Sequence, residues 1–275
     1  MRLQASQIPF SRTYRPAFTG AIGIAAAYRG FFFLQFFFQL FPLLTQLLLW
    51  NAVYSQGAAG MRVGGFGRSQ MFTYFFLMNL LGLANSSPWE MSADIRQGKL
   101  NQFLLKPIHY ALYQWHMLLG RISIELLYQS LPAAVLLLFA RHLVVLPAEA
   151  WRWPAFLFSL FLGIQIGFLV SFLIGCCAFW VLENSSFLHV LMPIQMLLEG
   201  GWFPLSLLPA PLFAVLSSLP FAYQTYFPAT IFLGSADPAR AVQGLATQCL
   251  WVLALGALSW LLWRRGTRAY CAVGG

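Results

Sequence analysis

The chain has 275 residues, of which 60% are hydrophobic and only 8% are charged, and its formal net charge is +9. Soluble domains carry about 25% charged residues, so this composition excludes an ordinary soluble globular protein. Its aromatic content of 17% excludes a disordered chain. What remains is an all-α protein that crosses a membrane several times.

The first predicted element is an amphipathic helix over residues 8–29. Apolar side chains recur every fourth residue from Phe10 to Ile22, and Arg12 and Arg15 lie off this stripe. A helix with this pattern lies on a membrane surface. It is not a secretory signal peptide, because its arginines are spread along its length and the strong apolar run begins only after it.

Uncharged apolar stretches locate six expected membrane spans, since a span needs about 20 mostly apolar residues. Their expected ranges are 31–54, 70–86, 120–140, 154–182, 185–199 and 241–263. The third span is less regular than the others because Arg121 and Glu125 lie at its start. These two residues are four positions apart, so on a helix they can pair near the membrane edge and partly neutralise each other.

A stripe of small residues runs along the fourth span, with one member every four residues. Its members are Gly163, Gly167, Ser171 and Gly175. This spacing lets two helices approach closely. The stripe therefore predicts either helix packing within the chain or an interface between subunits, and the sequence leaves both open.

The uncharged segment 200–236 does not have the pattern of a single span. It contains five prolines, which exclude one straight helix: Pro204, Pro209, Pro211, Pro220 and Pro228. We expect two short re-entrant helices, whose freed backbone groups need protein or water around them. Physical reasoning alone leaves two roles for this segment, a gate and an inert outer plug.

Lys and Arg residues are divided unequally between the two sides that six spans define. The side with both termini and the loop 87–107 has ten: Arg2, Arg12, Arg15, Arg29, Arg96, Lys99, Lys106, Arg264, Arg265 and Arg268. The other side has five: Arg62, Arg68, Arg141, Arg152 and Arg240. Cytoplasmic loops carry the excess of cations. We therefore expect both termini in the cytoplasm, and the positive charge needs no nucleic-acid partner.

The loop 87–107 is the largest polar segment on the cytoplasmic side between the expected spans. Ser87 and Glu90 have the spacing of a capping box, which begins a helix. Leu100 and Phe103 continue an apolar face at helical spacing. We expect a short amphipathic helix on the inner membrane face. It is either a solvated turn between spans or a docking helix for a cytoplasmic partner.

The sequence lacks the motifs of the common enzyme classes. It has no G-x-x-x-x-G-K-[ST] loop, so the chain itself is not expected to bind ATP, and no H-E-x-x-H or G-x-S-x-G motif. Scattered histidines and cysteines favour no metal site. Two alternatives to a transporter stay open. One is a membrane enzyme that acts on lipid, and the other is a membrane scaffold or assembly protein. The enzyme would have to use His109, His116, Arg121 and Glu125.

The stretch from Trp89 to Ile108, W-E-M-S-A-D-I-R-Q-G-K-L-N-Q-F-L-L-K-P-I, resembles the signature of a subgroup of ABC-2 type transporter permeases. That subgroup has an I-R-x-G-x-L … L-L-+-P pattern after its second span. The matching positions are Ile95, Arg96, Gly98, Leu100, Leu104, Leu105, Lys106 and Pro107. A second similar stretch, G-G-W-F-P-L-S-L-L-P, begins at Gly200.

This resemblance implies the permease subunit of an ABC exporter in a bacterial inner membrane, with no enzymatic activity of its own. ATP and Mg²⁺ would bind to a separate ATPase subunit, present in two copies. A second permease chain, identical or a sister, would complete the transporter. The loop 87–107 would be the coupling helix that contacts the ATPase, with Leu100 and Phe103 as apolar anchors. The coupling residues would be Glu90, Asp94, Ile95, Arg96, Gly98, Lys99, Leu100, Phe103, Lys106 and Pro107.

By the same resemblance, the segment 200–236 would close the exit for the cargo. Its gate residues would be Gly200, Gly201, Phe203, Pro204 and Pro209. An apolar and aromatic path between the two permease chains would suit an amphipathic or hydrophobic cargo. Four amides are candidate polar contacts along this path: Gln35, Gln39, Asn79 and Gln195. Structural hydrogen bonds between helices are the alternative role for these amides.

Overall fold

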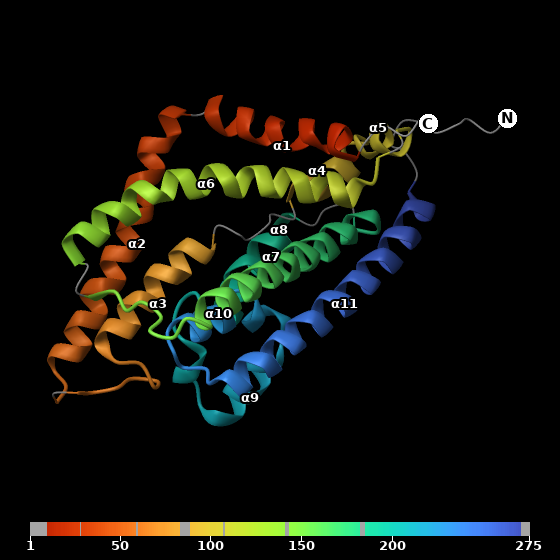
Figure 1. The fold of residues 1–275 in the computed structure, drawn as a ribbon. Helices are drawn as coiled ribbons and strands as arrows, with labels where there is room; N and C mark the ends of the chain where they lie inside the picture. Colours follow the sequence, from red (N-terminus) through yellow and green to blue (C-terminus); the bar gives the residue numbers. More distant parts are fainter. Residues whose placement is uncertain are drawn as a thin grey trace.

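The computed structural model describes residues 10–27, 29–58, 60–82, 89–106, 108–140, 143–181 and 185–270. This part of the chain is helical and contains no β-strand, which confirms the all-α prediction. Its longer helices are α1 (Phe10–Ala27), α2 (Arg29–Ser55), α3 (Arg68–Leu81), α6 (Tyr110–Ala140), α7 (Arg152–Cys176), α8 (Ser185–Leu198) and α11 (Pro238–Ala269). Figure 1 shows their arrangement.

The shorter helices gather in two places. α4 (Trp89–Arg96) and α5 (Leu100–Leu104) lie between α3 and α6 in the sequence, and the 3₁₀ helix η3 (Cys177–Phe179) continues α7. Between α8 and α11 lie η4 (Leu205–Leu207), α9 (Ala210–Ser218), η5 (Pro220–Tyr223) and α10 (Tyr226–Phe232). The segment with five prolines is thus a series of helices of three to nine residues.

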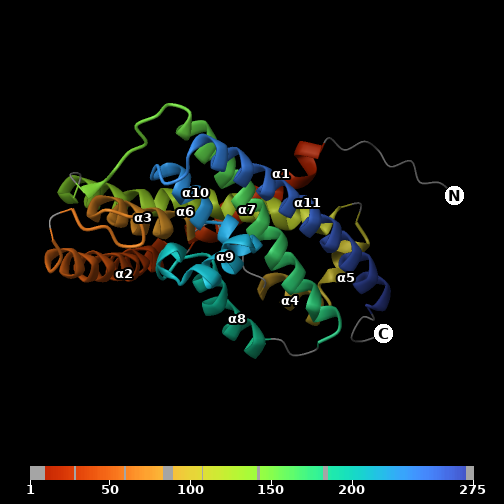
Figure 2. The same ribbon diagram turned by 90° about the horizontal axis from the view of Figure 1, so that it is seen from below.

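Two helices within the described residues are long and apolar enough to cross a membrane. They are Arg152–Phe179, which combines α7 with η3, and Pro238–Ala269, which is α11. Both lie over segments that the sequence marks as spans. The two helices run side by side in Figures 1 and 2. Gln248, fully buried on α11, joins them: its amide donates to the Ser159 carbonyl at 3.0 Å and accepts from the Ser159 hydroxyl at 2.9 Å.

α6 differs from its expected extent. It begins at Tyr110, ten residues before the expected span, and is one continuous helix. Its first turns pack on α1, where the Tyr14 ring stacks on His116 with centroids 5.0 Å apart. Further along, a Cβ atom at Gly120 would lie 2.5 Å from the Phe18 carbonyl oxygen. Among the α1 side chains that the structure describes, Tyr14, Ala17 and Ala21 are buried. This face of α1 therefore covers α6.

Loops that are far apart in the sequence meet at one end of the helices. The Ser206 hydroxyl donates to the Gly64 carbonyl at 2.7 Å, and the Gln70 amide donates to the Leu233 carbonyl at 3.1 Å. The Val145 backbone N–H donates to the Thr73 hydroxyl at 2.8 Å. The loops after α2, α6 and α8 therefore share this end, which we call the loop end.

The opposite end, which we call the α4–α5 end, holds the short helices α4 and α5. Met91 of α4 packs against Gly175 near the end of α7. The Tyr110 ring, at the start of α6, stacks on Trp263 of α11 with centroids 5.2 Å apart. In Figure 1 this end lies at the upper right, and α9 and α10 lie at the lower end.

Two glycines of the small-residue stripe on α7 explain what the stripe does. A Cβ atom at Gly163 would lie 2.4 Å from the Gln224 carbonyl oxygen, and one at Gly175 would lie 2.8 Å from the Met91 sulfur. Real Cβ atoms do not approach other atoms this closely. At both positions the stripe therefore packs against other segments of the same chain. Of the two alternatives, packing within the chain is the one found here.

The buried Arg152, at the start of α7, binds backbone carbonyls of α10 and of the turn that follows it. The guanidinium of Arg152 donates to the carbonyl of Ile231 at 3.2 Å, to the carbonyl of Ala236 at 2.8 Å, and to the carboxylate of Glu149 at 3.0 Å. It also lies over the Trp151 ring, 4.6 Å from its centroid. Backbone carbonyls and an ion pair together satisfy this charge, which is why it can be buried.

The carboxylate of Glu149 makes the stability of these Arg152 contacts depend on pH. The Trp151 indole N–H and the Arg152 guanidinium donate to it, and these hydrogen bonds hold its pKa below the ordinary value of 4.5. A lowered folded-state pKa stabilises the fold at neutral pH, and this contribution disappears as the pH falls through the folded-state value. We expect the thermal unfolding midpoint of the wild type to exceed that of Glu149→Gln near neutral pH and to converge with it as the pH falls through the folded-state pKa of Glu149, which lies below 4.5. Equal midpoints at every pH would contradict this expectation.

Candidate functional site

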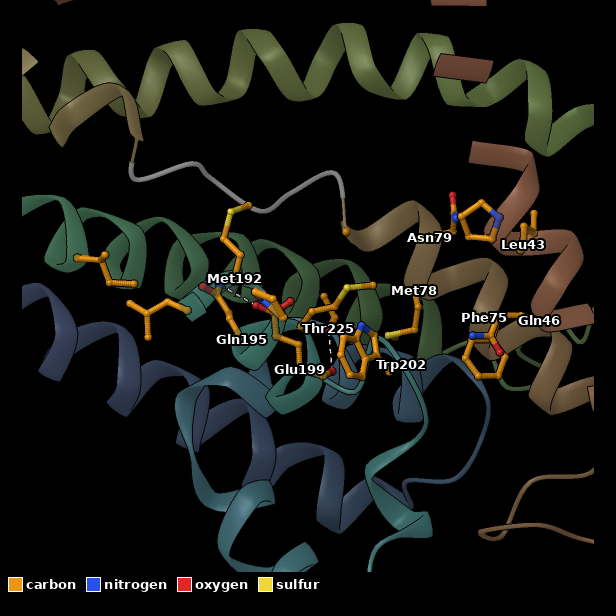
Figure 3. Close-up of a pocket in the computed structure, with 17 residues that line it drawn as sticks. Leu43, Gln46, Phe75, Met78, Asn79, Met192, Gln195, Glu199, Trp202 and Thr225 are labelled. Carbon is orange, nitrogen blue, oxygen red and sulfur yellow. Dashed lines mark hydrogen bonds between the residues drawn. The ribbon is translucent and has the colours of Figure 1, made fainter. Parts of the chain in front are cut away.

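A cavity of about 680 Å³ lies between α2, α3, α8 and the turn that follows α8. Figure 3 shows its lining. Most of the lining is apolar: Pro42, Leu43, Phe75, Met78, Gly82, Ile174, Leu191, Met192, Pro193, Met196, Gly201 and Trp202. Its polar members are Gln46, Asn79, Gln195, Glu199 and Thr225. This volume lies in the range of cavities that hold small molecules, about 300–1,000 Å³.

The polar members at the end of α8 form a connected group. The Gln195 amide donates to the Glu199 carboxylate at 2.7 Å and reaches the Gln224 side-chain oxygen at 3.5 Å. The Thr225 hydroxyl donates to the Glu199 backbone carbonyl at 2.9 Å. The first and third of these bonds hold Glu199 by both its side chain and its backbone. Glu199 is only 3% exposed, so an acidic group is held inside the protein at this point.

The turn after α8 depends on Gly200. Its φ is +81°, a left-handed conformation that glycine adopts without strain. The Tyr74 hydroxyl donates to the Gly200 carbonyl at 2.7 Å, and a Cβ atom at Gly200 would lie 2.6 Å from that hydroxyl oxygen. Tyr74 is fully buried. The glycine thus lets α8 end against α3 and directs the chain into the wall of the cavity.

The other predicted gate residues lie along the same turn. Gly201 lines the cavity, Pro204 is buried, Phe203 is partly buried, and Pro209 is exposed just before α9. The predicted gate residues thus belong to the loop end, where Ser206 is tied to the loop after α2.

Of the four amides predicted along the path, Asn79 and Gln195 line the same cavity, one from α3 and the other from α8. The side chains of Gln35 and Gln39 lie outside the described residues. Glu199, which also lines this cavity, was not among the residues that the sequence singled out. The available signal was its position four residues after Gln195, directly before two glycines. That spacing puts both side chains on one face of the helix.

At the α4–α5 end, the predicted coupling segment is two helices rather than one. Gly98, with φ +73°, separates α4 from α5. Ile95 and Leu100 are buried against the end of α7 with Met91, in a cluster that includes Phe172. Ile95 and Leu100 therefore hold the two helices on the rest of the chain.

Phe103 is also committed to the chain itself, because its ring packs on Tyr110 and Tyr113 with centroids 5.1 and 4.7 Å away. The expected anchoring of a partner by Leu100 and Phe103 does not fit these positions. Asp94 accepts a hydrogen bond from the Tyr110 hydroxyl at 2.8 Å, and Arg96 is partly buried.

The exposed part of this end has a different set of side chains. It presents Glu90, Lys99, Leu104, Leu105 and Lys106, and Leu105 is 87% exposed. Pro107 lies outside the described residues. The exposed apolar side chains at this end are therefore Leu104 and Leu105, whereas Leu100 is buried and Phe103 is partly buried. The amphipathic pattern of the sequence could not assign which apolar residues face inward.

The polar residues considered for a lipid-modifying enzyme do not gather into one site. From His109 to Glu125 they are spread along the start of α6 over about 24 Å. Arg121 and Glu125 approach at 3.7 Å, as their spacing predicts, and the His116 ring is stacked on Tyr14. No group of three or more His, Cys, Asp or Glu side chains that could hold a metal ion occurs among the described residues.

The two apolar helices long enough to span a bilayer, taken together with the family match that follows, identify a membrane protein. The model of a family described as ABC-2 family transporter protein matches residues 40–274. The chain therefore belongs to the ABC-2 transporter family, as the pattern from Trp89 to Ile108 suggested. No curated protein and no solved structure matches the chain.

Proposed function

We propose that the chain is the permease subunit of an ABC exporter that moves an amphipathic or hydrophobic molecule across a bacterial inner membrane. Family membership supports a permease subunit. In this proposal the chain crosses the membrane six times, ATP and Mg²⁺ bind to a separate ATPase present in two copies, and a second permease chain pairs with this one. The cargo passes between the two permeases, and the segment 200–236 closes its exit.

The α4–α5 end is the proposed attachment site of the ATPase. The main support for this assignment is that buried side chains hold α4 and α5 against the rest of the chain. Leu104 and Leu105 are nevertheless exposed, among charged groups. Partner contacts concentrate in such exposed apolar side chains with a polar rim.

The charge distribution supports placing this end in the cytoplasm. Lys99 and Lys106 lie at the same end as Arg264, Arg265 and Arg268, because Trp263 stacks on Tyr110 there. Within the described residues, the loop end has four basic residues: Arg62, Arg68, Arg152 and Arg240. The cytoplasmic side of a membrane protein carries the excess of Lys and Arg, and with Arg96 the α4–α5 end has six.

The test is Leu105→Asp in the full chain. Affinity purification from native membranes should recover at least about tenfold less ABC ATPase, because an apolar hot-spot contact contributes roughly 1.4 kcal/mol or more. ATP turnover of the recovered complex should fall with it. The matched control is Leu146→Asp, since Leu146 is 63% exposed at the loop end and should change recovery less than about twofold.

Equal recovery of the ATPase with Leu105→Asp and with the wild type would contradict the proposed attachment site. Thermal unfolding midpoints of the two variants should match, because both changes fall on exposed side chains. Leu100→Asp is not a useful probe of the partner, since Leu100 has no exposed surface and the change would unfold the α4–α5 end.

A further inference from the structure

α11 has one face packed against the chain and one face open. In Figure 1 this helix lies at the edge of the described helices, beside α7. Only 11% of its most apolar stretch is buried, compared with 44% for the corresponding stretch of α7. Its buried residues recur at helical spacing along one side: Ala241, Gly244, Gln248, Leu255, Ser259 and Gly266. The opposite side of α11 is therefore a free surface of this chain.

The open face of α11 carries an uninterrupted apolar row. Its exposed members are Ala246, Leu250, Leu253, Ala254, Ala257, Leu258, Trp260 and Leu261. Gln243 and Arg264 are the exposed polar residues that bound this row. They are 21 positions apart, which is about 31 Å along a helix. The hydrocarbon core of a bilayer is about 30 Å thick, so the row has the length of a surface that faces lipid across the whole membrane.

Three arginines follow the apolar row at the end of α11. Arg264, Arg265 and Arg268 are all exposed, and no acid within the described part of the chain forms an ion pair with any of them. Three positive charges are thus concentrated at one boundary of the apolar row. By the length of the row, this boundary lies at the level of the lipid headgroups.

Trp260 fixes the depth and direction of the first arginine. The Arg264 guanidinium lies over the Trp260 ring, 4.3 Å from its centroid. Tryptophan rings are enriched where the hydrocarbon core meets the headgroups. A guanidinium that rests on such a ring is held at this boundary by its planar face, while the N–H groups at its edge can still donate hydrogen bonds. The pair therefore has the geometry to bind a headgroup oxygen.

Two occupants fit an apolar helix face in a membrane, a second copy of the chain and lipid. In a two-fold pair the same surface of both copies meets itself. Because both copies would have the same orientation in the membrane, their arginines would lie at the same depth, where like charges repel. A phosphate complements these arginines instead, since guanidinium groups bind it through paired N–H donors. The charge at the end of α11 therefore favours an anionic lipid over a second copy.

We propose that the open face of α11 binds an anionic phospholipid. Arg264 and Arg268, four positions apart on one side of the helix, bind its phosphate. Arg265 adds positive potential beside them, and the acyl chains lie along the apolar row. This binding goes beyond the proposed permease function. It requires that α11 crosses the membrane, and it is independent of the cargo and of the ATPase.

The test compares two phospholipids with the same acyl chains and different headgroup charge. Dioleoylphosphatidylglycerol is an anion, and dioleoylphosphatidylcholine is net neutral. The full chain is purified in detergent, freed of lipid and titrated with each of them, and native mass spectrometry measures the fraction with one lipid bound. We expect the wild type to bind phosphatidylglycerol at least about tenfold more tightly, because each cation near the headgroups strengthens the attraction. Arg264→Gln combined with Arg268→Gln should reduce this preference to less than about threefold.

The matched control also removes two exposed arginines, but at the loop end. Arg62→Gln combined with Arg240→Gln should keep the preference within about twofold of the wild-type value. Equal binding of the two lipids by the wild type would overturn the proposal, and this comparison does not depend on the folding of any variant. A preference that persists in the variant without Arg264 and Arg268 would also overturn it, because other cations would then be its source.

A further arm separates a lipid from a soluble phosphate. Glycerol 3-phosphate carries an anionic phosphate but no acyl chains, so it cannot cover the apolar row. In tenfold molar excess it should displace little of the bound phosphatidylglycerol. Displacement of most of the lipid would mean that the arginines recognise a phosphate alone, and it would overturn the assignment of a lipid to this face.

Discussion

Replacing Arg152 by leucine is expected to lower the free energy of unfolding by about 3 kcal/mol or more, because each buried group left without its hydrogen-bond partner costs roughly 1–3 kcal/mol. The Ile231 and Ala236 carbonyls lose their donor, and both residues are buried. Glu149 loses its ion pair as well. The thermal unfolding midpoint in detergent, followed by tryptophan fluorescence, should fall by about 10 °C.

Arg240 provides the matched control for this change. It also pairs with an acid three residues away, at 3.7 Å from Asp237, but its side chain is exposed. Exposed ion pairs contribute about 0–1 kcal/mol, so Arg240→Leu should shift the midpoint little. The midpoint shift of Arg152→Lys should lie between those of Arg152→Leu and Arg240→Leu. A lysine keeps the positive charge but cannot reproduce the forked contacts of a guanidinium. Equal midpoint shifts for the leucine variants of Arg152 and Arg240 would show that the buried contacts do not cause the loss of stability in Arg152→Leu.

Replacing Gly163 by alanine is the second change with a large expected effect. The new Cβ atom would lie 2.4 Å from the Gln224 carbonyl oxygen, and this neighbour is backbone, which cannot rotate away. α7 must then separate from η5. Overpacking of this kind costs about 1–3 kcal/mol. Because Gln224 is followed by Thr225, the change also displaces a residue of the cavity wall.

Gly256 on α11 is the control, and the expected effect there has the opposite sign. A Cβ atom at Gly256 meets no atom within 4 Å. Alanine in a helix interior is more favourable than glycine by about 0.5–1 kcal/mol, so Gly256→Ala should raise the thermal midpoint. If both alanine variants raise the midpoint, α7 does not pack against the Gln224 backbone in the way described.

Much of the fold could be anticipated because membrane segments are long and nearly free of charge. α7 and α11 lie over runs that end at charged or tryptophan residues, and the prolines after Gly200 explain the short helices there. The start of α6 could not be predicted in this way. Tyr110 and His116 have the polarity of an interfacial segment, and only tertiary contacts with Trp263 and Tyr14 show that they belong to a helix.

The two candidate sites differ in how far sequence could define them. The pattern around Gly98 identified the α4–α5 segment, but an amphipathic helix has an apolar face that either its own chain or a partner can cover. Leu100 proved to face the chain and Leu105 the outside. The cavity depends on Glu199 and Thr225 meeting across 26 positions of sequence. Such a contact follows from the path of the turn, which local patterns do not determine.

The two glycine contacts of α7 give this helix a mechanical property. Gly175 packs closely against Met91 at the α4–α5 end, and Gly163 packs closely against Gln224 beside the cavity. These two contacts are twelve residues apart, about 18 Å along one helix. Close-packed contacts leave no slack and transmit displacement. A tilt of α7 beside α4 is therefore expected to displace the cavity wall at Thr225 as well, because α7 is closely packed at both positions.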